Sequence, residues 1–246
     1  MIAPRERLES VSSPFALWAG PRIEVAPFRL SGTVYATLLN HRRSLDALGD
    51  AVAAAPYKGA PKSVVLAVKP RPALVAPGGD VQIDDGAEAL EVGAALGIVI
   101  GTSACAVAEA DALGHVTGFL VVCDCTLPRA GHFRPQVRAM ARDASCVLGA
   151  AVMPRAQVAD PDALAIRVFV DGSLAQSSNT SEHVRTAARL IADVSDFMTL
   201  MPGDVLLTGS APDGPRARAG ARIAIEIDGV GRLETQVVAG AARLRA

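Results

Sequence analysis

The stretch from Val116 to Thr126 reads VTGFLVVCDCT and is apolar or β-branched almost throughout. Such a run, without proline, predicts a buried β-strand. Successive side chains of a strand point to opposite faces, so Cys123 and Cys125 are expected on one face and Asp124 on the other. Asp124 is therefore the exceptional residue of this strand.

Other strands are expected on both sides of this one. The block from Leu90 to Gly101 resembles a strand but has small residues in its middle, where side chains normally pack. Asp-Gly supplies the positive φ of a tight hairpin turn. Further strands are predicted at 33–40, 64–69 and in VLLTG, and hairpins around Asp171-Gly172 and Asp228-Gly229.

Two segments have helical spacing. A short helix is expected after His41, ending before Pro56. A longer one is expected from Ser181 to Met198, where the apolar residues fall on one face and residues 179–181 are available as N-terminal caps. The pattern as a whole predicts an α+β protein that is mainly β, with a few short helices and one longer helix.

Composition narrows the class of protein. A chain of 246 residues is long enough for one domain with its own core. Its net charge is −1, with basic and acidic residues mixed along the chain, which argues against a nucleic-acid partner. The four cysteines lack the paired spacing of a zinc site, so reduced, buried thiols are expected. No uninterrupted apolar run reaches about 18 residues. We therefore expect a cytoplasmic protein that does not associate with membranes.

Several ordered segments together resemble the fumarylacetoacetate hydrolase family. They are GTVYATLLNHRRSLDAL, APYKGAPKSVVLAVKP, FLVVCDCTLPRAGHFRP, SSNTSEHVRTAARLI and TLMPGDVLLTGSAP. The resemblance implies a mixed β-sandwich roll over residues 32–246, with residues 1–31 as an amino-terminal extension packed on it. It also implies a homodimer, or a hetero-oligomer with a sister subunit.

The family resemblance implies a Mg²⁺ or other divalent cation, held by a Glu-x-Glu pair and a later aspartate. Oxygen ligands of this kind suit hard cations. In this sequence Gly93 and Ala95 stand where the two glutamates are expected, and only Asp124 of the three ligands remains. We therefore expect this chain to bind a divalent cation weakly or not at all, with Glu91, on the same strand face, as the alternative ligand.

The resemblance also implies site residues. His41 is a candidate acid or base and Lys69 a candidate catalytic or carboxylate-binding residue, although a capping histidine and a solvent-facing lysine are the plainer interpretations. Arg134 and Arg138 are candidates for binding substrate carboxylates, with solvated loop arginines as the alternative. Thr208-Gly209-Ser210 resembles the family's Thr-Gly-Thr loop, which offers hydrogen-bond donors to a substrate carboxylate; without the family it would be an ordinary turn.

Within the family, the sequence is similar to the amino-terminal repeat of the isomerase/decarboxylase of 4-hydroxyphenylacetate (homoprotocatechuate) degradation. The implied activity is that of a carbon–carbon lyase and isomerase for unsaturated 2-oxo diacids. It comprises decarboxylation of 5-carboxymethyl-2-oxo-hex-3-ene-1,7-dioate, isomerisation of 2-hydroxyhepta-2,4-diene-1,7-dioate, or both. The alternative is a metal-free, non-catalytic partner of a sister chain. The missing glutamate pair and Met140, which stands where relatives commonly have a lysine, favour this second interpretation.

Overall fold

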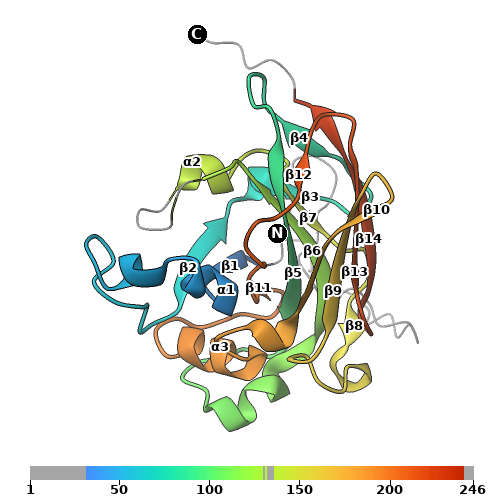
Figure 1. Ribbon diagram of the computed structural model, residues 1–246. Coiled ribbons are helices and arrows are strands. Elements are labelled where there is room, and N and C mark those ends of the chain that lie inside the picture. Colours follow the sequence, from blue (N-terminus) through green and yellow to red (C-terminus); the bar gives the residue numbers. More distant parts are fainter. Residues whose placement is uncertain (1–31, 130, 132–135, 241–246) are drawn as a thin grey trace, which may run out of the picture.

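A computed structural model describes residues 32–129, 131 and 136–240 (Figure 1). The predicted extension 1–31 lies outside the described residues. The strands are β1 (Val34–Leu38), β2 (Val65–Lys69), β3 (Leu74–Val75), β4 (Val81–Ile83), β5 (Leu90–Ile100), β6 (Val116–Thr126), β7 (Cys146–Leu148), β8 (Met153–Pro154), β9 (Ala165–Val170), β10 (Ser173–Asn179), β11 (Val205–Leu207), β12 (Arg216–Ala217), β13 (Arg222–Ile227) and β14 (Gly231–Ala239). The α-helices are α1 (Arg42–Asp46), α2 (Val137–Met140) and α3 (Ala187–Ser195), and short 3₁₀ helices span Gly49–Val52, Arg71–Ala73, Glu109–His115, Arg155–Gln157 and Thr180–Glu182.

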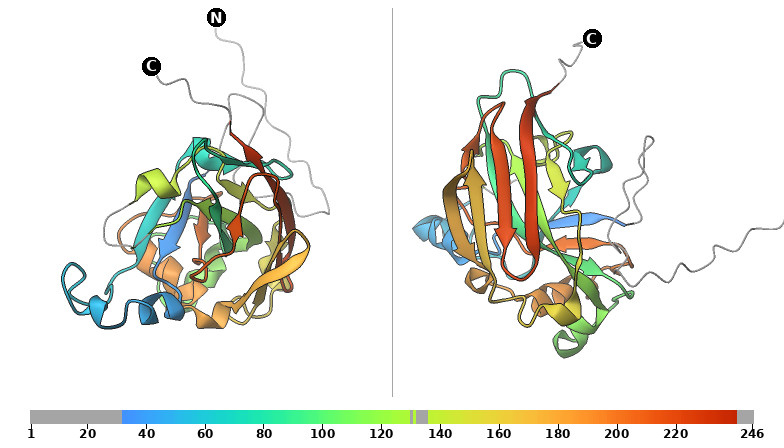
Figure 2. Two further views of the ribbon diagram at one scale, coloured as in Figure 1. Left: turned by 45° about the horizontal axis from the view of Figure 1, so that its top comes forward. Right: turned by 90° about the vertical axis from the view of Figure 1, so that its right-hand side faces the viewer.

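The strands of the described residues form two sheets. The larger has nine strands, ordered β2-β1-β11-β5-β6-β7-β3, with β12 on β5 and β8 on β6. The smaller has five, ordered β10-β9-β13-β14-β4, and faces the viewer in the right-hand panel of Figure 2. The main apolar core lies between the sheets and includes the buried face of α3. The α+β, mainly β prediction is confirmed.

The β5–β6 pair forms the longest ladder and separates two apolar clusters. Cys123 and Cys125 belong to the main core, whereas Ala95 and Val122 belong to a second cluster on the opposite face of the large sheet. Asp124 points to that second face, as its alternation with the cysteines predicts. It therefore lies on the face of the large sheet opposite to the main core.

The predicted hairpins and the short helix after His41 are present, but the long helix begins later than predicted. α3 starts at Ala187 with Thr186 as its N-cap, not at Ser181. The reason is tertiary: Asn40 accepts hydrogen bonds from the backbone N–H groups of Val184 and Arg185, at 2.8 and 2.9 Å, and this holds the segment extended. The caps predicted at 179–181 instead serve a short 3₁₀ helix.

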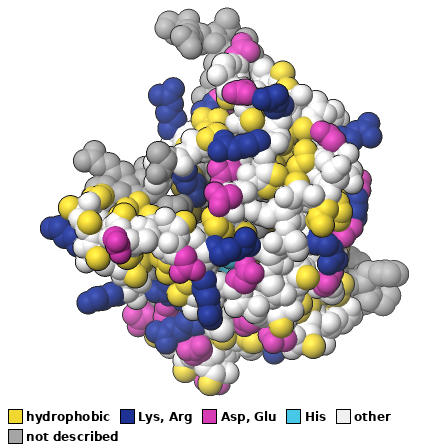
Figure 3. Space-filling model, viewed as in Figure 1, with side chains coloured by type: hydrophobic (Ala, Val, Ile, Leu, Met, Phe, Trp, Pro, Cys, Tyr) yellow, Lys and Arg dark blue, Asp and Glu magenta, His cyan; other side chains and the backbone are white. Residues whose placement is uncertain are grey.

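The structure bears on three further expectations, which concern the thiols, membrane-spanning helices and surface charge. Cys105 is exposed, contrary to the expectation that all four thiols are buried; the other three cysteines are buried and all four are free. Among the described residues, no helix combines the length and the apolar character needed to cross a membrane. On the face shown in Figure 3, basic and acidic side chains are interspersed, without a continuous basic surface.

Candidate active site

A cavity of about 490 Å³ opens on the face of the large sheet to which Asp124 points. Its lining residues fall in the stretches 36–48, 91–95, 124–131 and 207–216, together with Met140. Segments far apart in the sequence thus meet there because β1, β11, β5 and β6 are consecutive neighbours in the sheet. The volume suits a small molecule.

The most buried charges beside the cavity are paired with each other. Lys69 ends β2, and its Nζ lies 2.6 Å from Asp124 Oδ1 and donates a hydrogen bond of 2.8 Å to the carbonyl oxygen of Met140. The two side chains are 1% and 11% exposed. Lys69 itself does not line the cavity, whereas Asp124 does. Lys69 is therefore placed to act through Asp124 and not by direct contact with a bound molecule.

The cavity does not offer a ligand set for a hard cation. Gly93 and Ala95, where the family resemblance implies two glutamates, provide no side-chain oxygen, and the carboxylate of Asp124 is already paired with Lys69. Glu91 also lines the cavity, but it is the cross-strand partner of Arg216 in the β5–β12 pair. The distance between Glu91 Oε2 and Arg216 Nη2 is 3.9 Å. No group of three His, Cys, Asp or Glu side chains in the described part of the chain is arranged to hold a metal ion. The residues present do not fit the divalent cation that the family implies.

Local packing explains why position 93 is a glycine. Gly93 lies opposite Asp124 in the β5–β6 register. A Cβ atom added to Gly93 would come within 2.7 Å of the Asp124 carbonyl oxygen and 2.8 Å of Ser210 Oγ. Real Cβ atoms do not approach a backbone oxygen this closely, so a glutamate at this position requires the β5–β6 ladder to shift at Asp124 and the Ser210 hydroxyl group to move aside.

The Thr208-Gly209-Ser210 loop follows β11 and is held from beneath. Asn40 Nδ2 donates to the Thr208 carbonyl oxygen at 2.8 Å, and Thr37 Oγ1 donates to the carbonyl oxygen at the end of β11. Gly209 has φ +101°, and an added Cβ would lie 3.2 Å from Thr37 Oγ1. Gly209 and Ser210 line the cavity; the Thr208 side chain is buried and does not. Two of the three predicted loop residues therefore reach the cavity.

His41 is placed differently from its predicted position in the site. It is 2% exposed, does not line the cavity, and its Nε2 lies 2.8 Å from Glu182 Oε2. Burial lowers the pKa of His41, and the nearby Glu182 carboxylate partly offsets this. Its ring packs edge-to-face on His183, whose pKa burial lowers to about 4. Both rings are uncharged at neutral pH, and His183 hydrogen-bonds the backbone of Gly209, so this pair supports the loop from behind.

Two arginines that the sequence did not single out line the cavity. Arg129, three residues beyond β6, has a buried Nη1 with no hydrogen-bond partner among the described residues. Arg216 on β12 is 54% exposed and loosely paired with Glu91. Nothing in their spacing marks them, because each is one of many arginines in loops or short strands. Arg134, which the sequence did suggest, lies outside the described residues.

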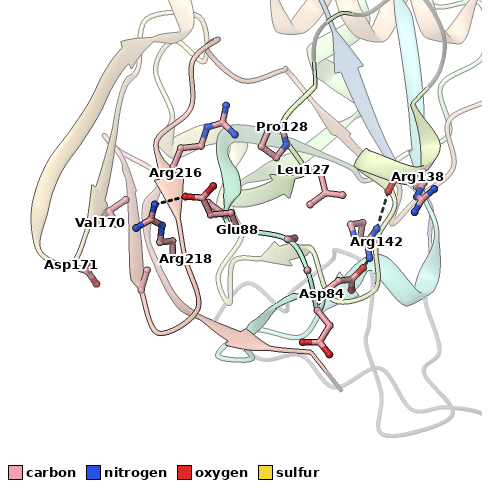
Figure 4. A pocket seen from close by; sticks show the side chains of 15 residues that line it. Asp84, Glu88, Leu127, Pro128, Arg138, Arg142, Val170, Asp171, Arg216 and Arg218 are labelled. Carbon is pink, nitrogen blue, oxygen red and sulfur yellow. Dashed lines mark hydrogen bonds and ion pairs between the residues drawn. The ribbon is translucent and has the colours of Figure 1, made fainter. Parts of the chain in front are cut away.

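Arg138 lines a separate hollow of about 850 Å³, not the cavity (Figure 4). In that hollow Arg138 and Arg142 lie on one side, and Arg218, paired with Glu88, lies on the other (Figure 4). Arg216 lines both spaces. The structure thus brings together Asp124, Glu91, Gly209 and Ser210, and leaves Arg138 outside this group.

This fold and site place the protein in a known class. Residues 33–238 match the model of the Fumarylacetoacetate (FAA) hydrolase C-terminal family, and the chain belongs to this family of enzymes. A curated relative is the 4-hydroxyphenylacetate degradation bifunctional isomerase/decarboxylase of Escherichia coli, 34% identical over 209 residues, which cover 85% of this chain and 48% of the relative. The chain therefore spans about half the length of that relative.

Solved structures agree with the family assignment. The 5-carboxymethyl-2-hydroxymuconate delta-isomerase of Mycobacterium smegmatis is 28% identical, with a TM-score of 0.68 over 85% of this chain and 79% of that one. A maleylpyruvate hydrolase of Sphingobium sp. SYK-6, solved with manganese(II) and pyruvate, is 26% identical, with a TM-score of 0.68 over 85% of this chain and 70% of that one. The predicted family and fold are confirmed.

Proposed function

We propose that this chain binds an unsaturated 2-oxo diacid in the 490 Å³ cavity and isomerises it, decarboxylates it, or does both, without a bound metal ion. The observation that carries this proposal is the meeting of Asp124, the Gly209-Ser210 loop and Arg129 in one small-molecule cavity, where the buried Nη1 of Arg129 has no hydrogen-bond partner among the described residues. The names of relatives support this class of reaction and substrate: one is a bifunctional isomerase/decarboxylase, and another is a 2-hydroxyhepta-2,4-diene-1,7-dioate isomerase. The second substrate, 5-carboxymethyl-2-oxo-hex-3-ene-1,7-dioate, is the one that the family resemblance implies.

Isomerisation needs a group that moves protons. The diene substrate loses a proton from its 2-hydroxyl oxygen and gains one at carbon 5, while the double bonds shift to C2=O and C3=C4. A carboxylate within reach of the substrate performs such transfers as a general acid or base. Asp124 is our candidate, with Lys69 as the positioning residue that holds its carboxylate in place at 2.6 Å. Glu91 on β5 is another carboxylate that lines the cavity.

Decarboxylation needs an electron sink. When the C–CO₂ bond breaks, its electron pair moves through the conjugated system to the 2-oxo oxygen, which a proton or a cationic donor must then stabilise. The cationic donors that line the cavity are, among the described residues, Arg129 and Arg216, and the hydroxyl group of Ser210 is a neutral donor beside them. These groups supply positive potential where a dication is expected in other members of the family.

The experiment is turnover by the purified chain alone. The two substrates, 2-hydroxyhepta-2,4-diene-1,7-dioate and 5-carboxymethyl-2-oxo-hex-3-ene-1,7-dioate, are supplied in separate assays. Their ultraviolet absorbance is followed, and each assay is repeated with a chelator. We expect turnover that the chelator leaves unchanged and that Asp124→Asn reduces at least about 100-fold, as expected for loss of a general acid–base group. Turnover that the chelator abolishes contradicts the metal-free proposal.

The missing ligand set favours a second candidate, a non-catalytic subunit. Absence of turnover by this chain with either substrate supports a role as partner of a metal-binding sister chain. In that case the two chains elute together in size-exclusion chromatography, and addition of this chain raises the activity of its sister. Homodimer formation, also predicted from the family, is distinguished by the mass of the isolated chain in solution.

A further inference from the structure

We propose that Arg129 binds the 2-oxo acid end of the substrate, in the role that a divalent cation has in metal-dependent relatives, and that Arg216 binds the distal carboxylate. This inference rests on the proposed function and names how its site recognises substrate. It assigns the specificity of the cavity to two arginines to which no role is assigned from the sequence alone.

The first argument is the unsatisfied charge on Arg129. Its Nη1 is buried, yet no described residue accepts a hydrogen bond from it. A buried donor without an acceptor is costly, and more so when it carries charge, so such groups occur mainly where water or a ligand completes them. Because Arg129 lines the cavity, a bound molecule is the natural partner.

The second argument is the charge balance of the cavity. Asp124 is neutralised by Lys69, and Glu91 lies 3.9 Å from Arg216. Asp213, the other acid on the lining, is exposed. This leaves Arg129 as a positive charge with no carboxylate among the described residues, in a space from which the expected glutamates are absent. Such a site favours an anion over a cation.

The third argument is geometric. A planar guanidinium group offers parallel N–H donors that match a carboxylate and its adjacent keto oxygen, which a metal ion would otherwise chelate. Arg216, 54% exposed on β12, lines both the cavity and the neighbouring hollow. A diacid whose 2-oxo end contacts Arg129 is therefore expected to direct its other end towards Arg216.

Binding of two probes in the presence of EDTA tests both assignments. Pyruvate presents the 2-oxo acid end alone, and 2-oxoadipate presents both ends. By calorimetry, we expect Arg129→Gln to weaken both probes about 10- to 100-fold, as is typical for loss of a charged hydrogen-bond partner, and Arg129→Lys to weaken them less. Arg216→Gln is expected to weaken 2-oxoadipate but not pyruvate.

Arg218→Gln is the matched control, because Arg218 lines only the neighbouring hollow and is expected to change neither affinity. Circular dichroism and thermal melting confirm that each variant is folded. Unchanged pyruvate binding in Arg129→Gln, or binding by the native chain only when Mg²⁺ is added, overturns the inference. Binding that depends on Arg129 in a chain without turnover refutes the proposed catalysis and leaves this inference standing, so the two failures are distinguishable.

Discussion

Replacement of Lys69 by methionine is expected to lower the free energy of unfolding by about 3–5 kcal/mol. The Lys69 side chain is 1% exposed and its Nζ is 2.6 Å from Asp124 Oδ1, so its removal leaves a largely buried carboxylate without its counter-charge. The carbonyl oxygen of Met140 also loses a donor, which adds about 1 kcal/mol. For a domain of this size each kcal/mol lowers the melting temperature by about 2–4 °C.

A double-mutant cycle separates the ion pair from the other effects of substitution. Asp124→Asn alone leaves a buried ammonium group, whereas the double variant has neither charge. The double variant is therefore expected to be more stable than the sum of the single losses predicts, by at least about 2 kcal/mol. Urea unfolding followed by circular dichroism measures all four proteins. Single losses that add to within about 0.5 kcal/mol refute the reasoning. Arg218→Met, which breaks the exposed pair with Glu88, is the control and should cost less than about 1 kcal/mol.

The remaining predictions concern packing, protonation and thiol access. Gly93→Ala is expected to lower the free energy of unfolding in urea by about 1–3 kcal/mol, because the new Cβ would meet the Asp124 carbonyl oxygen. Gly114→Ala is the control: its Cβ meets nothing within 4 Å and should leave stability unchanged. Equal losses in the two variants contradict the packing argument. Burial lowers the pKa of His183 to about 4, so between pH 4 and 6.5 the unfolded chain binds more protons than the folded one. This group should therefore remove about 3 kcal/mol of stability as pH falls from 6.5 to 4. His183→Gln should make the free energy of unfolding less dependent on pH over this range. An unchanged dependence in the variant excludes a buried neutral imidazole at His183. A thiol reagent should react rapidly with Cys105 alone in the native chain and with all four cysteines in urea; several fast thiols in the native chain contradict the described burial.

The strands and turns were predictable because their signals are local. Alternation in β6 separates Asp124 from its cysteine neighbours, and the Asp-Gly pairs supply the turns of both hairpins. In the first of these, Asp171 and Gly172 both have positive φ, 50° and 80°. These features depend on residues adjacent in sequence, which a single sequence records directly.

The start of α3 and the position of His41 depend on distant contacts. Apolar spacing extends the helix back to Ser181, but Asn40, about 145 residues earlier, holds the segment extended. Its main-chain carbonyl oxygen accepts a hydrogen bond from Val184 N–H, and its side-chain oxygen accepts one from Arg185 N–H. The same contact draws His41 against Glu182 and away from the cavity. No helical pattern contains this information, because the competing hydrogen bonds come from another part of the fold.

Arg129 shows the corresponding limit for the site. In sequence it is one arginine in a loop, with the same weight as Arg134 or Arg138. Only the fold distinguishes them, because it buries a nitrogen of Arg129 on the cavity and places Arg138 in another hollow. Arg129 lies within a segment that carries the family resemblance, but the resemblance assigned it no role.

The changes around Asp124 form one consistent set. A hard cation requires several anionic oxygens, and β5 has Gly93 and Ala95 where the family resemblance implies two glutamates. With no cation present, an unpaired Asp124 would be a costly buried charge, and Lys69 at 2.6 Å removes that cost. The cavity then lacks positive potential for a 2-oxo acid, and Arg129 is the group that supplies it. The loss of the glutamates is therefore compatible with a working site, provided that recognition of the substrate has passed from a metal ion to a guanidinium group.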